Sequence, residues 1–369
     1  MKIGFDAKRV FHNTTGLGNY SRDLVRILAK FYPKNTYYLY NPKPKKVHRL
    51  ELTESMKEVL PDTTFWKKFS SIWRQTAITK QIKNDEIEVF HGLSGEIPRG
   101  LKKHKIKSIV TIHDLIFMRY PKLYSFFDRK IHFKKFKYAA ENANKVIAIS
   151  EQTKKDIITF LKIAPSKIEV IYQGCNDVFK EERNATEKKE FLEKFNIPKT
   201  FLLNVGTIEE RKNALSIVKA VKDIDIPLII IGRKTKYYTQ IEDYIHKNDL
   251  AHKIYFLEGL TLKELSTAYQ LAEFFIYPSI FEGFGIPIIE ALFSKTPVIT
   301  SKEGVFPEAG GPSSLYVDPY NVNELKEAIE LLLNSKNKRE KMVDEGFDFV
   351  QKFNDEFIVK KIKSIYKEL

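Results

Sequence analysis

One stretch, Tyr277–Thr300, constrains the fold more than any other part of the chain; it reads YPSIFEGFGIPIIEALFSKTPVIT. A short aromatic and aliphatic run ends at Pro278, and a loop with two glycines follows. Apolar residues with helical spacing begin at Ile286, and another apolar run opens at Pro297. The stretch predicts a strand, a loop, a helix and a strand in succession, the pattern of an α/β protein with a parallel sheet.

Two glutamates in this stretch need hydrogen-bond donors. Glu282 lies in the loop and Glu290 lies inside the helix among apolar residues, where an unpaired carboxylate is costly to bury. Sugar hydroxyls are suitable donors, and hydrogen bonds to a charged group are worth roughly 1.5–3 kcal/mol each. The backbone N–H groups of Gly283–Ile286 favour an anion such as phosphate. The alternative is that Glu282 only supplies charge to the helix start and that Glu290 pairs with a lysine.

A second polar loop, Gly206–Asn213 (GTIEERKN), follows the predicted strand Phe201–Val205. Arg211 and Lys212 fall near the start of the next helix. A bidentate guanidinium, an ammonium and a helix dipole together suit a diphosphate. The alternative is a solvated run of charge.

The N-terminus predicts a strand, Lys2–Asp6, a loop, Asn13–Asn19, and a helix, Tyr20–Phe31. Gly16-Leu17-Gly18 in the loop is half of a dinucleotide-binding fingerprint. Ser21 stands where the third glycine belongs, so the sequence argues against NAD binding.

Another predicted strand, Lys105–Ile112, ends in His113 and Asp114. Ligands of parallel sheets gather at the carboxyl ends of the strands. A histidine there can donate a hydrogen bond to a sugar oxygen or a phosphate near neutral pH. The alternative is that the two side chains only cap the strand end.

The other elements are coarser predictions. They comprise a strand at Thr36–Tyr40, a turn at Asn41–Lys46, a basic helical segment at 47–83, a strand at Ile87–Phe90, a linker at Gly174–Lys180 and a last helix at Glu356–Leu369.

The segment from Glu282 to Ala291, E-G-F-G-x-P-x-x-E-A, resembles the signature of retaining glycosyltransferases of family four, which have the two-domain GT-B fold. The resemblance implies that Glu282 contacts the donor sugar and that Glu290 contacts the nucleotide ribose. The loop at 206–213 is similar to the family's diphosphate-binding loop, which assigns that role to Arg211 and Lys212.

The resemblance extends to the first half of the chain. TIHDLIFMRYP is similar to a T-x-H-D-L segment of bacterial mannosyltransferases in the family. It implies that His113 and Asp114 lie beside the donor sugar. Other positions that it assigns to donor binding are Gly16, Gly18, Gly206, Gly259, Gly283, Phe284 and Gly285. Gln173 and Asn176 depart from the family's pattern, so the resemblance assigns no contact there.

Length and composition agree with two domains. We expect two Rossmann-like domains facing a cleft: residues 1–175, which bind the acceptor, and 176–351, which bind the nucleotide sugar. Residues 352–369 should cross back to the first domain, as the resemblance implies. A lone cysteine, Cys175, fits a reducing compartment, and neither a signal peptide nor a membrane-spanning run is evident. We expect a cytoplasmic protein.

Charge is unevenly distributed. Residues 1–176 hold 34 Lys and Arg against 16 Asp and Glu, whereas residues 177–369 hold 28 against 31. The segment Lys122–Asn142 interleaves basic and aromatic residues and predicts an amphipathic cationic helix. Such a helix can lie on an anionic membrane, which would place the protein on the inner face of the cell membrane. It can also pack on the core with a solvated face; nucleic-acid binding is the weakest interpretation.

The expected activity is transfer of a hexose with retention of configuration, with Glu282, His113, Arg211 and Lys212 at the reaction centre. The resemblance favours mannose from GDP-mannose, then a UDP-sugar, and a glycan or lipid-linked acceptor in cell-surface polysaccharide synthesis. No cofactor or metal is expected, because Asp223 and Asp225 fall in a turn and not at a strand end. The rival predictions are a sugar-nucleotide epimerase of the same fold, an inactive sugar-nucleotide-binding protein and a nucleic-acid binder.

Overall fold

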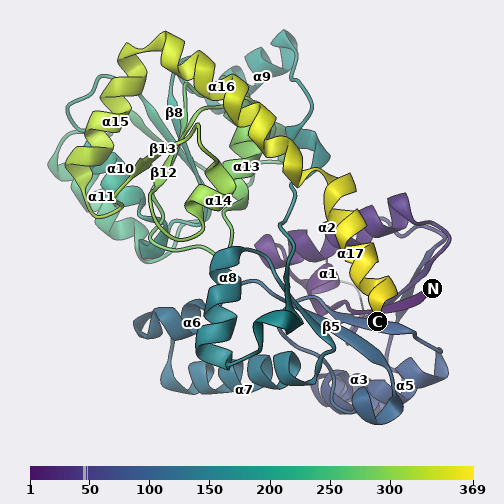
Figure 1. Ribbon diagram of the computed structural model, residues 1–369. Coiled ribbons are helices and arrows are strands. Elements are labelled where there is room, and N and C mark those ends of the chain that lie inside the picture. The colour runs from purple at the N-terminus through teal and green to yellow at the C-terminus, as the bar shows by residue number, and fades with distance from the viewer. Residues whose placement is uncertain (45–46, 48) are drawn as a thin grey trace. The chain divides into compact units, whose positions relative to one another are not determined.

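The computed structural model describes residues 1–44, 47 and 49–369, and the chain forms two compact units (Figure 1). The first unit comprises Met1–Gln173 and Asp355–Leu369, and the second comprises Gly174–Asn354. The omitted positions belong to the expected turn at 41–46 and the expected helical segment at 47–83. Each unit is a parallel sheet covered by helices, as the alternation of elements predicts.

The first unit is built on a sheet of seven parallel strands in the order β3-β2-β1-β4-β5-β6-β7. The strands are β1 (Lys2–Asp6), β2 (Thr36–Tyr40), β3 (Met56–Val59), β4 (Val89–Gly92), β5 (Lys107–Ile112), β6 (Lys145–Ala148) and β7 (Ile168–Val170). The order reverses between β1 and β4, so their connections leave in opposite directions. The central strands are buried on both faces, which explains their continuous apolar runs.

Helices cover both faces of this sheet. One face packs against α1 (Lys8–His12), α2 (Gly16–Phe31) and α17 (Asp355–Glu368). The other face packs against α5 (Ile78–Asn84), α6 (Ile116–Arg119), α7 (Phe126–Asn142) and the π-helical turns η1 (Trp73–Ala77) and η4 (Ile157–Leu161). The remaining helical segments are α3 (Thr64–Lys68), α4 (Ser70–Ile72), η2 (Lys102–His104), η3 (Pro121–Leu123), α8 (Glu151–Asp156) and η5 (Pro165–Lys167).

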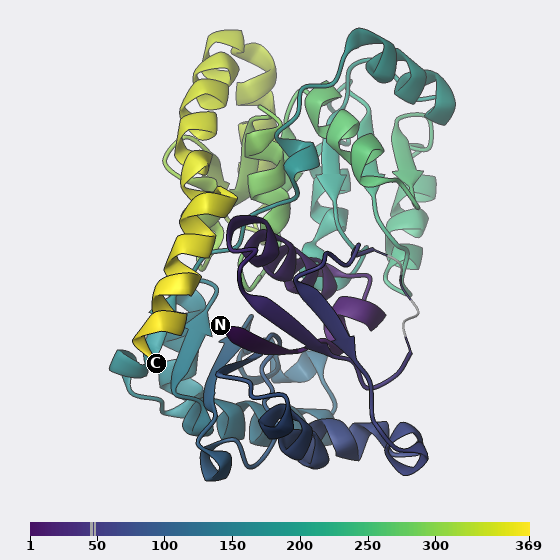
Figure 2. The same ribbon diagram turned by 90° about the vertical axis from the view of Figure 1, so that its right-hand side faces the viewer.

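The last helix, α17, lies against the first unit beside α2, as Figure 2 shows in yellow. Its stripe of Ile358, Ile362 and Ile365 is buried in the core that α2 also lines. Tyr366 adds a buried hydrogen bond of 2.7 Å to Nδ1 of His91, and burial lowers the pKa of His91 to about 3. The prediction that the final helix packs on the first domain is confirmed.

The segment at 47–83, expected to be helical and basic, differs in part from that expectation. Met56–Val59 forms β3, which pairs in parallel with the edge strand β2. The run MKEV carries no strong strand pattern of its own, so pairing with β2 decides its conformation. The helices begin only at Thr64.

Two helix starts also differ. The helix expected at Tyr20 begins at Gly16, and the one expected from Lys122 begins at Phe126. The glycines at 16 and 18 therefore lie in the first turn of α2, not in a loop before it. Ser125 caps α7 by accepting the N–H of Asp128.

The second unit has six parallel strands in the order β10-β9-β8-β11-β12-β13. They are β8 (Leu202–Val205), β9 (Leu228–Ile231), β10 (Ile254–Leu257), β11 (Phe275–Tyr277), β12 (Val298–Ser301) and β13 (Leu315–Val317). The helical segments are η6 (Asp177–Phe179), α9 (Ala185–Phe195), η7 (Glu210–Lys212), α10 (Ala214–Ala220), α11 (Tyr238–Lys247), α12 (Leu262–Leu271), α13 (Ile286–Phe293), α14 (Phe306–Gly310), α15 (Val322–Asn334), α16 (Lys336–Val350) and η8 (Gln351–Phe353).

The strand order of this sheet reverses between β8 and β11, which are hydrogen-bonded neighbours. The connections that follow these two strands therefore separate at the carboxyl edge of the sheet. Open parallel sheets bind ligands in the crevice at such a point. The loops 206–213 and 278–285 begin there, and they hold Arg211, Lys212 and Glu282.

Candidate functional site

The two loops after β8 and β11 are joined by hydrogen bonds. The N–H of Ile280 donates to the carbonyl oxygen of Arg211 at 2.8 Å. The side-chain amide of Asn213 donates to Pro278 O at 3.2 Å and to Pro319 O at 2.6 Å. These bonds fix the backbone on which Arg211, Lys212 and Glu282 sit. Glu282 lies 70 residues after Lys212 in the sequence. The pairing of β8 with β11 brings their two loops together.

Glu282 is the centre of a compact ionic cluster. Its Oε1 lies 2.8 Å from Nη1 of Arg211 and 2.5 Å from Nζ of Lys212. The hydroxyl of Tyr277, the last residue of β11, donates to the same oxygen at 3.0 Å. Arg211 also pairs with Glu209 at 2.6 Å. A carboxylate, a guanidinium and an ammonium therefore meet within the second unit.

Burial and charge act in opposite directions on this cluster. Burial alone would raise the pKa of Glu282, but attraction to Lys212 and Arg211 outweighs it and lowers the pKa to about 2. Burial lowers the pKa of Lys212, and Glu282 offsets only part of that effect. The pKa of Arg211 is raised, because Glu282 and Glu209 outweigh its burial. Glu282 is therefore ionised at neutral pH and is a weak base.

Two glycines of the site have distinct structural reasons. Gly285 has a φ of 103° and directly precedes α13, a left-handed conformation that strains other residues. The aliphatic stem of Lys212 lies over Gly206, where an added Cβ would come within 3.6 Å of it. Gly285 thus sets the entry into α13, whereas Gly206 is favoured by its φ of 150°, because a Cβ at 3.6 Å would make only an ordinary van der Waals contact.

The other predicted donor-binding positions of the second unit are more dispersed. Gly283 precedes Phe284 in the loop before α13. The ring of Phe284 is buried and packs on Phe353 with centroids 5.4 Å apart, so only its backbone can face a ligand. Gly259 follows β10, the edge strand two places from β8, and open space surrounds the position of a Cβ there.

Glu290 lies in α13 and is half-buried. The hydroxyl of the fully buried Tyr269 donates to its Oε2 at 3.1 Å. Burial and the Glu290 charge both raise the pKa of Tyr269, so the phenol remains protonated. Each glutamate therefore accepts a hydrogen bond from a phenol, and Glu282 in addition pairs with Arg211 and Lys212.

Replacing Tyr269 with Phe tests this support. We expect Y269F to lower the free energy of unfolding by about 1.5–3 kcal/mol, the usual worth of a hydrogen bond to a charged group. It should also weaken nucleotide binding if Glu290 contacts the ribose. Denaturant unfolding and nucleotide titration measure the two effects. An unchanged midpoint would show that the phenol does not support Glu290.

His113, in the first unit, already has protein partners at both ring nitrogens. Nε2 lies 2.9 Å from Leu93 O, and because a carbonyl only accepts, Nε2 carries the proton. Nδ1 is then the acceptor, and the amide of Gln173 donates to it at 3.3 Å. Burial lowers the pKa of His113 to about 4. The side chain is a neutral, positioned imidazole, and a sugar or phosphate contact through it requires a rearrangement.

The remaining predicted residues of the first unit surround the start of α2 and the end of β5. Asp114 accepts the N–H of Ile116 at 3.1 Å, which begins α6. Gly16 is open, because a Cβ added there would have no heavy atom within 4 Å, whereas a Cβ at Gly18 would come within 2.1 Å of Asn13 O. Gly18 is therefore required by close packing, and Gly16 is the position that a ligand can approach.

Three side chains with site contacts were missed as functional residues in the sequence. Tyr277 binds Glu282, Tyr269 binds Glu290, and Gln173 donates to the ring of His113. Tyr277 could have been found, since it is the last residue of a strand at the edge where ligands bind. Nothing local to Tyr269 or Gln173 marks them, because their partners come from other elements.

Two protein-family models match the chain. "Glycosyltransferase Family 4" matches residues 14–178, and "Glycosyl transferases group 1" matches residues 186–349. Together they cover both units. The motifs at 206–213 and 282–290 fall in the second match.

Curated relatives carry matching names. An uncharacterized glycosyltransferase of Methanocaldococcus jannaschii is 31% identical over 63% of this chain and 62% of its own length. The O-antigen chain mannosyltransferase RfbU of Salmonella typhimurium is 32% identical over 60% of this chain and 59% of its own length. The matches thus span about three fifths of these two relatives. The O-antigen chain mannosyltransferase B of Escherichia coli is 23% identical over the full length of both chains.

Solved structures share the fold. Sucrose-phosphate synthase from Thermosynechococcus elongatus superposes with a TM-score of 0.81 at 20% identity, covering 100% of this chain and 98% of that one. Anabaena HepE in complex with UDP-glucose gives 0.78 at 14% identity over the full length of both. The predicted GT-B fold, with two Rossmann-like units and a final helix on the first, is confirmed. The chain belongs to the family-four, group-1 glycosyltransferases.

Proposed function

We propose that this protein transfers a hexose from a nucleotide-activated sugar to a glycan or lipid-linked acceptor with retention of anomeric configuration. The observation that carries the proposal is the cluster of Glu282, Arg211 and Lys212 at the switch point of the second sheet. Its two cations suit a diphosphate leaving group, and its carboxylate suits the hydroxyls of the donor sugar. Cell-surface polysaccharide synthesis is the process in which we place it.

The proposed reaction breaks the bond between the anomeric carbon and the oxygen of the donor diphosphate. A new bond forms between the anomeric carbon and the acceptor oxygen. Arg211 and Lys212 stabilise the negative charge that develops on the departing diphosphate. The acceptor proton passes to the leaving phosphate oxygen. Glu282, with its pKa of about 2, orients the sugar and is too weak a base to take that proton at neutral pH. His113 lies beside the donor sugar in this proposal, with Asp114 and Gly16 nearby.

Mannose from GDP-mannose is the favoured donor, followed by a UDP-sugar. The support for mannose comes from the O-antigen mannosyltransferases, one of which matches the chain over its full length. The UDP-glucose complex of a structural relative supports the second choice. Thermal-shift titration with GDP, UDP, GDP-mannose and UDP-glucose should show that one nucleotide and its nucleotide sugar stabilise the protein against unfolding. If none of the four ligands stabilises the protein, the proposal is overturned.

Product analysis separates the proposed activity from its rivals. A retaining transferase consumes the donor and the acceptor together, and the anomeric proton coupling of the product reports retention. Conversion of the donor without an acceptor would indicate an epimerase. Nucleotide-sugar binding without any turnover across acceptors would indicate an inactive binding protein.

Transfer should not require a divalent metal. Asp223 and Asp225 lie in the turn before β9, and Asp223 is 3.5 Å from Lys326. Within the described part of the chain, no group of three or more His, Cys, Asp or Glu side chains is arranged to hold a metal ion. We expect activity to persist in excess EDTA. Complete loss that manganese or magnesium restores would contradict this expectation.

The basic first unit is the part that we propose to place on the inner face of the cell membrane. No helix in the described ranges has the length and apolarity needed to cross a bilayer, so the attachment proposed is peripheral. The helix α7 carries Lys130, Lys134, Lys135 and Lys137, and basic residues near an anionic surface contribute roughly 1 kcal/mol each. Sedimentation with anionic vesicles at low salt should retain the protein, and high salt should release it.

A further inference from the structure

Two segments of the first unit expose large apolar side chains. Among the described residues, nine of the sixteen exposed large hydrophobic side chains lie at 60–72 and 123–131. They are Leu60, Phe65, Phe69, Ile72, Leu123, Tyr124, Phe126, Phe127 and Ile131. Phe127 is 76% exposed and Phe126 is 61% exposed. Single exposed apolar residues are ordinary, whereas side chains that gather in one exposed patch mark an interaction surface.

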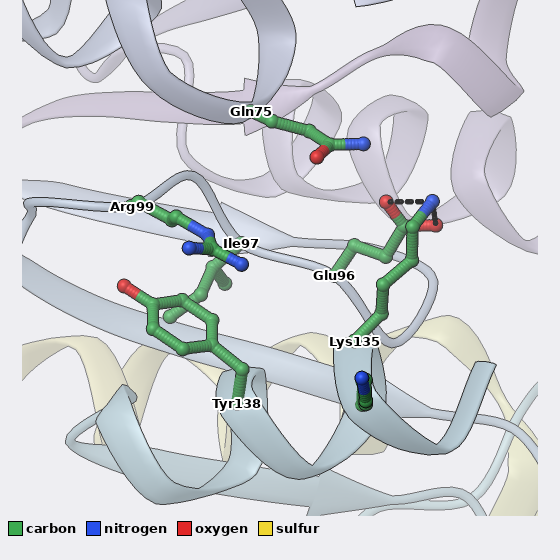
Figure 3. A pocket seen from close by; sticks show the side chains of 7 residues that line it. Gln75, Glu96, Ile97, Arg99, Lys135 and Tyr138 are labelled. Carbon is green, nitrogen blue, oxygen red and sulfur yellow. Dashed lines mark hydrogen bonds and ion pairs between the residues drawn. The ribbon is translucent and has the colours of Figure 1, made fainter. Parts of the chain in front are cut away.

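A pocket of about 70 Å³ lies within the same unit, lined by elements that adjoin both segments (Figure 3). Its lining includes Gln75 of η1, Glu96 and Arg99 of the connection after β4, and Lys134, Lys135 and Tyr138 of α7. About 10–15 Å³ of such space holds one water, so the pocket has room for a larger polar group. The pocket therefore lies between η1, which follows α3 and α4, and α7, which begins at Phe126.

The pocket carries uncompensated positive charge. Its one carboxylate, Glu96, is occupied by Arg74 at 2.9 Å and by Lys135 at 3.4 Å. Neither the Arg99 guanidinium nor the Lys134 ammonium has a carboxylate within 4.0 Å in the ranges that the structure describes. The Arg99 guanidinium lies over the ring of Tyr138, 5.3 Å from its centroid, which holds it in place at the pocket. Two cations are thus left for an anionic ligand.

The helix α7 links the pocket to the exposed apolar side chains. Phe127, Ile131, Lys134 and Tyr138 follow one another at spacings of four, three and four residues, which places them on one helical face. Phe127 is seven residues from Lys134, or about 10 Å along the axis. A ligand that reaches the pocket as an anion would therefore have aromatic and aliphatic side chains one to two turns away.

We propose that this pocket binds the phosphate of an anionic phospholipid at a bilayer surface. Arg99 and Lys134 contact the phosphate, and Phe127 and Ile131 enter the interface beside it. The exposed face of α3 and α4, with Phe65, Phe69 and Ile72, provides the second apolar contact. A phosphate at the end of an apolar molecule matches both features, whereas a soluble phosphate uses only the cations. The proposal rests on the peripheral membrane attachment proposed above, and it names the site and the ligand.

The test measures binding of the full chain to vesicles of phosphatidylcholine with and without phosphatidylglycerol. A double variant, R99Q with K134Q, removes the two available cations. A matched control, K34Q with K247Q, removes the same charge from exposed positions outside the pocket and its flanking segments. We expect the pocket variant to bind phosphatidylglycerol vesicles about tenfold more weakly than the parent and the control to change less than twofold.

A second variant, F127Q with I131Q, tests the apolar contact and should also weaken vesicle binding. Equal vesicle binding by the parent and the pocket variant would overturn the proposal. Equal losses of binding in the pocket variant and in the control would also overturn it, because they would show that total charge, and not the pocket, determines vesicle binding. Inorganic phosphate could instead stabilise the parent against heat and fail to stabilise R99Q/K134Q, while both proteins bind vesicles equally. That result would assign the pocket to soluble phosphate. If the parent protein does not bind anionic vesicles, the proposed lipid site and the proposed membrane attachment are both wrong. Binding of the nucleotide-sugar donor, measured by thermal shift, tests the proposed glycosyltransferase function separately.

Discussion

Replacing Arg211 and Lys212 together with alanine should weaken binding of a nucleoside diphosphate by about 100-fold or more, while the affinity for the nucleoside changes little. Each cation offers a charge-assisted hydrogen bond worth roughly 1.5–3 kcal/mol, and the nucleoside lacks the phosphates that use them. Calorimetric titration of GDP and guanosine, or of UDP and uridine, measures the ratio. The ratio of the two affinities, rather than either value alone, identifies the diphosphate contact.

The double substitution needs a control for charge and one for folding. K188A with K189A removes two lysines from α9 in the same unit and should leave both affinities unchanged. Thermal unfolding of R211A/K212A without ligand reports the effect of leaving Glu282 without its cations, whose attraction lowers its pKa. Equal losses of affinity for the nucleoside and the nucleoside diphosphate would contradict the assignment.

Replacing Glu282 and Glu290 one at a time should produce different kinetic patterns. E282A should lower kcat about 100-fold, because an ill-positioned sugar loses the aligned geometry of the reaction. E290A should mainly weaken nucleotide binding, because this side chain lies in α13 beside Tyr269, outside the loop that holds Glu282. Steady-state kinetics with both substrates varied, together with nucleotide titration, separates the patterns. Equal and small effects of both substitutions would refute the division of roles.

The isosteric variant E282Q adds a pH test with a defined sign. Glu282 raises the pKa of Lys212 against the lowering effect of burial. Removing the negative charge therefore lowers the pKa of Lys212 further, so the ammonium loses its proton at a lower pH than in the parent. Nucleoside diphosphate binding by E282Q should weaken at a lower pH on the alkaline side than binding by the parent. An unchanged alkaline limit would show that Lys212 does not carry the diphosphate contact.

The candidate site could be predicted in outline because its residues follow strand ends in short motifs. The spacing of Glu282 and Glu290 and the run Arg211-Lys212-Asn213 are local features, and the order of elements that carries them is local as well. Periodicity also predicted α17, since Ile358, Ile362 and Ile365 mark one face of a helix. The family resemblance rests on the same motifs.

The state of the site residues depended on contacts that no local pattern encodes. The pairing of Glu282 with two cations follows from the adjacency of β8 and β11. His113 was expected to face a ligand, yet both of its ring nitrogens have partners from other elements. Phe284 lies in the signature loop, but its ring packs on Phe353, far along the chain. Burial and partner choice of this kind are tertiary properties.

By itself, the sequence determined the alternation of strands and helices, the positions of the motif loops and the excess of positive charge in the first half, because each depends on neighbouring residues or on composition. Only the tertiary structure decided that Met56–Val59 is a strand, since its pairing with β2 supplies the hydrogen bonds that its side chains do not predict. Only the tertiary structure placed Arg99 beside Tyr138 and Lys134 at one pocket, because residues so distant in sequence meet only when the connection after β4 packs against α7.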